Sequence, residues 1–296
     1  MIKVDHISKS FGKVKAVGGV SFEVAEGENL ILLGTSGCGK TTTLKMINRL
    51  IEPTSGEIYI ANKNIKEQQP EELRRGIGYV LQNNGLFPHY TVAENIAIVP
   101  QLLNWSKKQT EHRMHELLEK LHLDKSHLKT YPKELSGGQQ QRVGLARALV
   151  ADPPVLLMDE PFGALDNVTR SKIQAEFKAL DELKRKTIVM VTHDVQEAFE
   201  LGDRICLMDK GKIVQCGSPA DLLFKPANSF VRDFLKEQKL LLEFKSVRLS
   251  DMQLKIEGAH SDDTVWSAMG KLKISGDPIK ELAKLMTAFS QYKLKL

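Results

Sequence analysis

Short, wholly apolar runs punctuate this chain, and three of them end in polar residues that can carry chemistry. These runs are Leu30–Leu33, Val155–Met158 and Ile188–Val191. Runs of this kind are typical of parallel strands that are buried on both faces of a sheet. Ligands of open α/β sheets bind at the carboxyl ends of such strands, so we expect one ligand to touch the residues after all three runs.

Helical periodicity fills most of the segment between the first two runs. Apolar residues recur every three or four positions after Ser106, which has the spacing of a helix-capping box with Gln109. These positions are Met114, Leu117, Leu118 and Leu121, and a later set is Ile173, Phe177 and Leu180. We therefore expect residues 87–151 to form a helical subdomain inserted into an α/β core.

The pattern changes after residue 238, and the segment 239–296 contains no nucleotide motif. Met252, Leu254 and Ile256 alternate with polar residues, which favours a strand. A later apolar set falls on one face of a helix, namely Leu282, Leu285, Met286 and Phe289. We expect a small α+β appendage, to which the sequence assigns no role.

Composition excludes several classes of protein. The 296 residues are 42% hydrophobic and 27% charged, which is ordinary for a globular protein. Lysine and arginine are dispersed rather than clustered, so the net charge of +5 does not indicate nucleic-acid binding. The sequence has no long apolar run and no apolar leader at its start, and its three cysteines are scattered. We therefore expect no membrane span, no secretory signal and a reducing compartment.

A glycine-rich loop follows the first apolar run and precedes a helix-compatible segment that includes Thr42. Its residues are Gly34, Thr35, Ser36, Gly37, Cys38, Gly39, Lys40 and Thr41. Strand, glycine loop and helix in this order are the context of a phosphate-binding loop. Glycines let backbone N–H groups converge on an anion, and the helix N-terminus adds partial positive charge. We expect Lys40 to reach the β and γ phosphates and Thr41 to ligate Mg²⁺.

The other two runs end in candidate catalytic groups. Asp159 follows the second run and can hold Mg²⁺, because hard cations prefer oxygen ligands. Glu160 is adjacent and is a candidate general base toward water. His193 follows the third run, where it could donate a hydrogen bond to a γ-phosphate. Adjacent strand residues point to opposite faces, so the two carboxylates need not compete for one role.

A second glycine turn begins at Ser136, an N-cap type of residue that is followed by Gly137, Gly138 and Gln139. It predicts a second anion-binding helix N-terminus in the same chain. Since one nucleotide already has its phosphate loop, this turn either serves another site or binds a nucleotide held by another copy of the chain.

Taken together, these motifs resemble the ATPase subunit of an ABC transporter. The glycine loop is similar to the Walker A motif, Leu135–Gln139 to the LSGGQ signature, and Val155–Glu160 to Walker B with its catalytic glutamate. The resemblance also assigns Gln82 to the Q-loop, Asp166 to the D-loop and His193 to the switch histidine. Phe11 occupies the place where the family stacks an aromatic ring on adenine, more often a tyrosine.

The resemblance covers about residues 1–238 and implies a P-loop NTPase cassette. Such a cassette has a RecA-like core, an antiparallel β subdomain and an inserted helical subdomain. It implies ATP and Mg²⁺ as cofactors, with Gln82 sensing the metal. It also implies what the second glycine turn binds, because family members pack head to tail with ATP between the Walker A of one copy and Ser136–Gly138 of the other. The expected partners are therefore a second copy, integral membrane permease subunits and, indirectly, an extracytoplasmic solute-binding protein, with the chain peripheral on the cytoplasmic face of the inner membrane.

Residues 85–105 indicate the branch of the family. Ile98-Val99-Pro100, followed by Leu102, Leu103 and Trp105, resembles ATPases of importers for glycine betaine, carnitine and choline. The same residues also suit a permease-docking surface shared with polar amino-acid importers, and a soluble ABC ATPase outside transport is a remote alternative. Many osmoprotectant ATPases continue into paired CBS domains that tune activity to ionic strength. Residues 241–296 are too few for such a pair, so we expect no salt gating of that kind.

Overall fold

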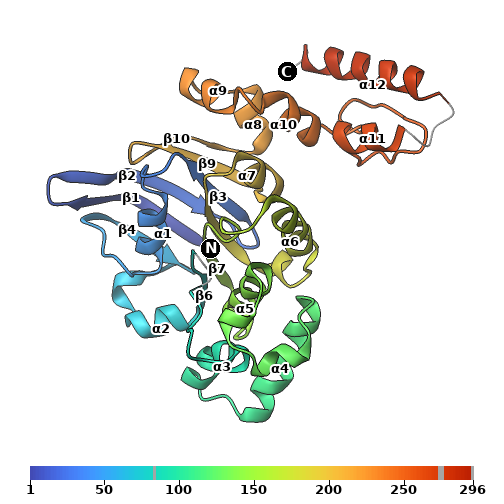
Figure 1. The fold of residues 1–296 in the computed structure, drawn as a ribbon. Helices are drawn as coiled ribbons and strands as arrows, with labels where there is room; N and C mark the ends of the chain where they lie inside the picture. Colours follow the sequence, from blue (N-terminus) through green and yellow to red (C-terminus); the bar gives the residue numbers. More distant parts are fainter. Residues whose placement is uncertain (83–84, 273–276, 295–296) are drawn as a thin grey trace. The chain divides into compact units, whose positions relative to one another are not determined.

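The computed structural model describes residues 1–82, 85–272 and 277–294, and it divides into two compact units (Figure 1). The first unit is Met1–Val214 and the second is Gln215–Leu296. The boundary that we expect after residue 238 lies inside the second unit and stays a prediction. Parts of the expected appendage, at 273–276 and 295–296, lie outside the described residues.

A four-stranded sheet begins the first unit, with strand order β2-β1-β4-β5. Its strands are β1 (Ile2–Phe11), β2 (Val14–Val24), β4 (Ser55–Ile60) and β5 (Lys63–Asn64). β1 pairs antiparallel with both β2 and β4, and β4 pairs antiparallel with β5. Ile2, Val4 and Ile7 of β1 are buried, as expected for a sheet with one face on a core. This is the antiparallel subdomain that the resemblance implied.

The second sheet has six strands in the order β10-β9-β3-β8-β7-β6. They are β3 (Asn29–Gly34), β6 (Ile77–Val80), β7 (Val155–Asp159), β8 (Thr187–Thr192), β9 (Arg204–Asp209) and β10 (Lys212–Gly217). β3 pairs parallel with β8 and β9, and β7 pairs parallel with β6 and β8. The three apolar runs are thus the neighbouring strands β3, β8 and β7, and their carboxyl ends meet at one edge, as the sequence predicts.

The helices of the first unit connect the strands of this sheet, and three of them form the segment between β6 and β7. They are α1 (Lys40–Ile47), α2 (Pro70–Arg75), α3 (Val92–Leu102), α4 (Lys107–Lys120), α5 (Gly137–Leu149), α6 (Asn167–Ala179) and α7 (Val195–Leu201), with short 3₁₀ turns at Ile65–Glu67, Lys125–Lys129, Pro132–Glu134 and Leu183–Arg185. Ser106 caps α4 by accepting the Gln109 N–H at 3.2 Å. Met114, Leu117 and Leu118 are buried, which confirms the helical pattern. Residues 87–151 contain three of these α-helices, α3, α4 and α5.

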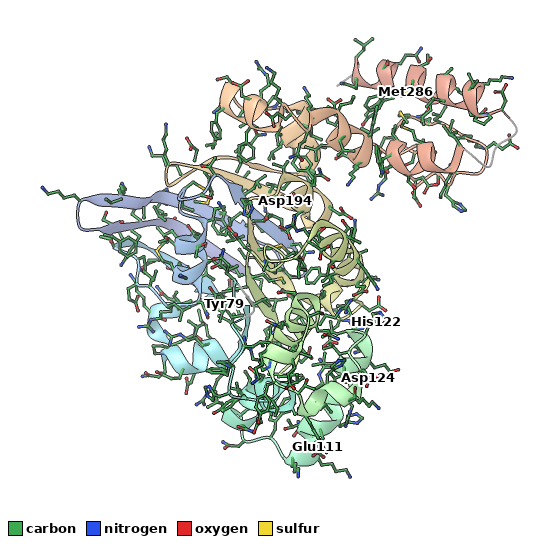
Figure 2. All side chains as sticks on the ribbon, viewed as in Figure 1. Tyr79, Glu111, His122, Asp124, Asp194 and Met286 are labelled. Atoms are coloured by element: carbon green, nitrogen blue, oxygen red, sulfur yellow. The ribbon has the colours of Figure 1, made fainter. Side chains whose placement is uncertain are left out.

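Helices dominate the second unit after β10. They are α8 (Pro219–Phe224), α9 (Ser229–Leu235), α10 (Lys239–Ser246), α11 (Val265–Lys271) and α12 (Pro278–Lys293). Its core includes Phe244, Leu285 and Phe289, with Met286 of α12 packed against it (Figure 2). The predicted helix face on α12 is confirmed at three of its four positions, and the fourth, Leu282, is exposed. Within the described residues, no helix of the chain combines the length and apolarity needed to cross a membrane.

The strand predicted at Met252, Leu254 and Ile256 is wrong. These residues lie in a turn-rich connection, where Gln253 has a φ of 52° and the Leu254 N–H bonds the carbonyl oxygen of Leu249 at 3.0 Å. The three side chains still join the helical core. Ile256 is buried in this core, and Met252 and Leu254 pack against it. Apolar alternation over so few residues fits such a turn as well as a strand.

Candidate active site

The glycine loop joins β3 to α1 in a conformation that only glycine adopts without strain at three positions, one of which is Gly37, with a φ of 79°. Gly34 has a φ of 151° and Gly39, the N-cap of α1, has a φ of 103°. A Cβ on Gly34 would lie 2.3 Å from the carbonyl oxygen of Met208, and one on Gly39 would lie 2.6 Å from that of Ala16. The first N–H groups of α1 have no partner within the helix, so the loop presents donors to an anion.

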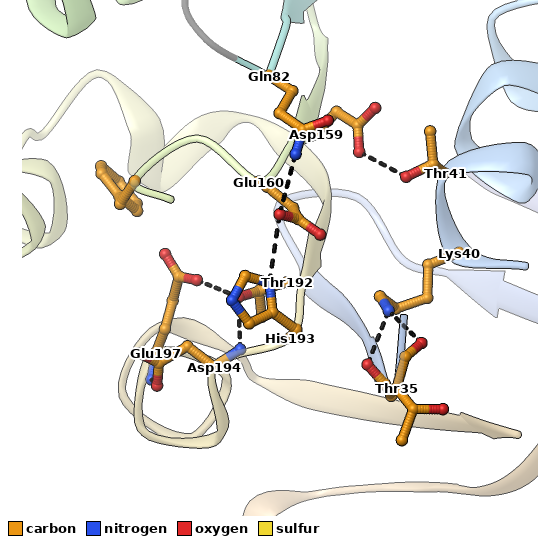
Figure 3. A network of polar contacts seen from close by, with 12 residues as sticks. Thr35, Lys40, Thr41, Gln82, Asp159, Glu160, Thr192, His193, Asp194 and Glu197 are labelled. Atoms are coloured by element: carbon orange, nitrogen blue, oxygen red, sulfur yellow. Dashed lines mark hydrogen bonds and ion pairs between the residues drawn. The ribbon is translucent and has the colours of Figure 1, made fainter. Parts of the chain in front are cut away.

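Lys40 is turned back onto its own loop. Its ammonium donates to the carbonyl oxygens of Gly34 at 2.7 Å and Thr35 at 2.9 Å (Figure 3). Its Nζ also lies 3.8 Å from the Sγ of Cys38, and burial raises the pKa of that thiol. Lys40 is itself buried. The structure therefore keeps the cation at the loop, one side-chain rotation away from an anion bound there.

Thr41 and Asp159 form the oxygen pair expected at a Mg²⁺ site. The Thr41 hydroxyl donates to Oδ1 of Asp159 at 2.9 Å, from the start of α1 to the end of β7 (Figure 3). Burial raises the pKa of Asp159, while the bond from Thr41 opposes that shift. A hydroxyl and a carboxylate at this distance fit a hard cation that keeps some of its water ligands.

Glu160 links two more predicted site residues. Its Oε2 accepts from Nε2 of Gln82 at 3.2 Å and lies 3.2 Å from Nδ1 of His193 (Figure 3). Glu160 has a φ of 45°, and its N–H bonds the carbonyl oxygen of Val191 in the neighbouring strand. A positive φ in a residue with a side chain is a strained conformation of the kind found at functional sites. The strand ends thus gather one carboxylate, one amide and one imidazole.

The Ser136 turn forms the predicted helix start on α5. Ser136 Oγ accepts the Gln139 N–H at 3.3 Å, and the Gln139 side chain accepts the Ser136 N–H at 2.8 Å. This reciprocal pair is a complete capping box. Gln139 Nε2 also lies 3.2 Å from Nε2 of His127. The described side-chain bonds of this turn are therefore local, and they do not join it to the phosphate loop of the same chain.

Two predicted residues lie apart from the strand-end cluster. Asp166 is the N-cap of α6, where its Oδ1 accepts the N–H groups of Val168 and Thr169. Phe11 ends β1 with half of its surface exposed, and the Lys9 ammonium lies 5.3 Å from its ring centre. An exposed ring in this place is free to stack on a flat ligand.

Sequence reasoning missed a second polar cluster directly behind His193. Glu197 and Gln174 are buried there, on α7 and α6, and Glu197 contacts Thr192 (Figure 3). Burial raises the pKa of Glu197 to about 7. The one available signal was an acidic residue in the first turn of a helix that is capped by Asp194, and this pattern alone predicts an exposed helix cap.

Comparison with known proteins places these features in a family. The family model described as ABC transporter matches residues 17–163. The glycine betaine/carnitine/choline transport ATP-binding protein OpuCA of Bacillus subtilis is 53% identical over 242 residues, which are 81% of this chain and 64% of that protein, or just under two thirds of its length. The glycine betaine uptake system ATP-binding protein YehX of Escherichia coli is 52% identical over 248 residues, 84% of this chain and 80% of that protein.

A solved structure agrees with this relationship. The dimeric post-hydrolysis state of the ATP-binding cassette MJ0796, bound to ADP and Pi, superposes with a TM-score of 0.66 at 36% identity. The match covers 74% of this chain and 98% of that one. The predicted cassette fold and the resemblance to ABC transporter ATPases are thus confirmed. The chain belongs to the family of ABC transporter ATP-binding proteins.

Proposed function

We propose that this chain is the ATP-hydrolysing subunit of an ABC importer for quaternary ammonium osmoprotectants such as glycine betaine. The observation that carries the proposal is the meeting of Thr41 with Asp159, and of Gln82 and His193 with Glu160, at the ends of neighbouring parallel strands. The osmoprotectant assignment rests on relatives whose names state glycine betaine, carnitine or choline transport.

ATP binds, in this proposal, along the glycine loop with its adenine against Phe11. The backbone N–H groups from Gly37 to Thr42 cradle the phosphates, and Lys40 exchanges its loop carbonyl partners for phosphate oxygens. Thr41 and Asp159 would hold Mg²⁺, either directly or through water. When bound, the ion would neutralise phosphate charge.

Hydrolysis is assigned to the Glu160 cluster. A carboxylate of this kind accepts the proton of a water aligned for in-line attack on the γ-phosphate. Its contacts to Gln82 and His193, both at 3.2 Å, fix the position of Oε2. His193 has a half-exposed side chain, so its ring can also donate to a phosphate oxygen. Positioning of this type is where phosphoryl transfer gains most of its rate.

A second copy of the chain completes the site. The capping box of Ser136 and Gln139 presents the start of α5 as a donor for an anion, without a partner from its own phosphate loop. The solved cassette that resembles this chain is described as dimeric and bound to ADP and Pi. We infer a head-to-tail pair in which Ser136, Gly137, Gly138 and Gln139 of one copy face the nucleotide of the other, with Asp166 beside the interface.

A permease subunit docks, in this proposal, next to Gln82. A hollow of about 260 Å³ lies there, lined among others by Arg74, Tyr79, Leu81, Phe87 and Arg147. Leu81 and Phe87 expose large apolar surfaces, which suit a protein partner. Because Leu81 directly precedes Gln82, a segment seated in the hollow can act on the Glu160 cluster. We therefore propose that the chain is a peripheral subunit on the cytoplasmic face of the inner membrane, with a solute-binding protein acting through the permease.

Uptake of labelled glycine betaine tests the proposal. Cells that lack their own osmoprotectant systems receive the cognate permease genes with either this chain or its Lys40→Ala variant. Uptake at high osmolarity that requires Lys40 would support both the role in ATP-driven import and the osmoprotectant substrate. Equal uptake with both chains, together with ATP hydrolysis by the purified chain, would reject the osmoprotectant assignment in favour of another small solute.

A further inference from the structure

A buried carboxyl group lies behind the turn that carries His193. Glu197 is 4% exposed and sits in the first turn of α7, whose N-cap is Asp194 (Figures 2 and 3). Asp194 Oδ1 accepts the Glu197 N–H at 3.1 Å. In a capping box the Glu197 carboxylate would turn back to the Asp194 N–H, but here it bonds the hydroxyl of Thr192 instead. No step of the proposed hydrolysis uses this carboxyl.

The hydrogen bonds of this cluster fit an ionised Glu197. Thr192 Oγ1 accepts the Asp194 N–H at 3.0 Å, so its single hydrogen is available to Oε2 of Glu197. Gln174 Nε2 donates to the other carboxylate oxygen, Oε1, at 3.3 Å. Both oxygens of Glu197 therefore accept, which suits an ionised carboxylate. Residues 192 and 194 on either side of His193 are thereby tied to α7 and α6.

Helix α6 connects the same cluster to the segment before Asp166. Arg170 donates from Nη2 to the carbonyl oxygen of Leu165 at 2.8 Å and from Nε to that of Phe162 at 3.2 Å. Its Nη1 forms an ion pair with Asp194 at 3.5 Å. One face of α6 thus contacts two segments. Arg170 bonds the backbone before Asp166 and pairs with Asp194 beside His193, and Gln174 reaches the same turn through Glu197.

We propose that Glu197 is a positioning residue for His193. Through its contacts with Thr192 and Gln174 it holds the His193 turn in a fixed position relative to α6. This inference rests on the proposed ATPase function and adds to it a link, within one chain, between the Asp166 segment and the imidazole that contacts Glu160. A turn held at both flanking residues presents its middle residue in one direction, and catalytic rates respond steeply to such placement.

The link depends on pH near neutrality, because the pKa of Glu197 is raised to about 7. Burial is the main cause that raises the pKa of Glu197 to about 7, Asp194 adds to the shift, and Thr192, Gln174 and Arg170 oppose it. Strands β3 and β8, which pack against α7, contain only uncharged residues. Protonation at Oε1 removes the bond from Gln174, and protonation at Oε2 reverses the bond with Thr192, whose oxygen then accepts. We expect turnover to fall as pH drops below about 7 through loosening of the His193 turn.

Variants at Thr192 and Glu197 test the link in the full chain. Thr192→Val keeps the shape and removes the hydroxyl, and Thr192→Ser is its matched control because it keeps the donor. We expect Thr192→Val to lower kcat for ATP roughly tenfold with KM nearly unchanged, and Thr192→Ser to stay close to wild type. Glu197→Gln does not titrate and replaces one of the two accepting oxygens with an NH2 donor, as protonation does, so we expect reduced turnover at pH 8 and a flattened profile between pH 6 and 8.

A double-mutant cycle separates positioning from general destabilisation. If Thr192 and Glu197 act through His193, then Thr192→Val costs no further activity in a His193→Ala background, measured in single turnovers with radiolabelled ATP. An equal loss in both backgrounds would overturn the proposal, and so would a Glu197→Gln profile with an unchanged acidic limb. A wild-type chain that hydrolyses no ATP would instead reject the proposed function, which keeps the two failures distinct.

Discussion

The chain has two glycine-rich turns at helix starts, and their glycines are present for different reasons. In the phosphate loop, Gly34 and Gly39 have positive φ values, and a Cβ on either would overlap the chain's own backbone. At the start of α5, a Cβ on Gly137 would meet Leu165 Cδ2 at 3.7 Å, an ordinary contact. A Cβ on Gly138 would come within 3.0 Å of the Thr169 Cγ2 atom, a side-chain methyl rather than backbone.

The glycines of the phosphate loop are therefore required by the fold of the chain itself, whereas Gly137 in the Ser136 turn is not. The phosphate loop needs glycine in order to fold at all between β3 and α1. Gly137 has room for a methyl group within its own chain, so packing inside one chain does not account for the glycine there. In the proposed dimer, the nucleotide of the second copy would approach this glycine from outside, and variants in and around the two turns test that asymmetry.

The largest effect is expected for Glu160→Gln. Removal of the base should lower turnover by about 10²–10⁴, because a positioned general base contributes that much. The Ser136 turn is untouched, so ATP-driven dimerisation should persist, as measured by light scattering or size-exclusion chromatography with ATP. Glu111→Gln, an exposed carboxylate on α4 (Figure 2), serves as the control. Unchanged hydrolysis in Glu160→Gln would remove Glu160 from the role of base.

Lys40→Ala should weaken ATP binding to the isolated chain. Loss of a charge-assisted contact costs about 1.5–3 kcal/mol, which corresponds to about tenfold to 10²-fold in Kd. Titration with a fluorescent ATP analogue measures the affinity, and Lys107→Ala, at a side chain that is 90% exposed, is the matched control. Equal affinity in the two variants would contradict the assignment of the phosphate loop.

Gly34→Ala should destabilise the fold itself. The residue needs a φ of 151°, and the new Cβ would lie 2.3 Å from a backbone oxygen. We expect a loss of about 2–4 kcal/mol in the free energy of unfolding, from backbone strain and overlap together. Urea denaturation of the nucleotide-free chain measures it. A value within about 0.5 kcal/mol of wild type would show that the loop adapts, and the comparison with Gly137 would fail.

Gly137→Ala should leave the free energy of unfolding within about 0.5 kcal/mol of wild type, because its Cβ meets no close neighbour. ATP-driven dimerisation should weaken by roughly 1–2 kcal/mol, since the methyl group would intrude on the nucleotide of the second copy. Gly270→Ala, another helical glycine with open space around its Cβ, is the control. Dimerisation as strong as in the control would place the Ser136 turn outside the interface.

Local signals in the sequence identified most of the candidate site. Four of its parts lie at or directly after the end of a buried strand, namely the glycine loop, Asp159, Glu160 and His193. One stretch of sequence therefore predicts both the strand and the site residue. The same logic failed where the signal was short, as at Met252–Ile256, where three alternating apolar residues form a turn against a helical core. The sequence also did not predict that the Lys40 ammonium contacts the carbonyl oxygens of its own loop.

The sequence by itself determined the family motifs, the parallel strands and the residue types at their ends, because these depend on neighbours within a few positions along the chain. Tertiary structure alone decided the pairings between Gln82 and Glu160, between Glu160 and His193, and between Gln174 and Glu197. These contacts join segments that are distant in sequence, and strand order sets which of them become neighbours. The burial that raises the pKa of Glu197 has the same origin, since it comes from the helix and strands that pack around α7 in the folded chain.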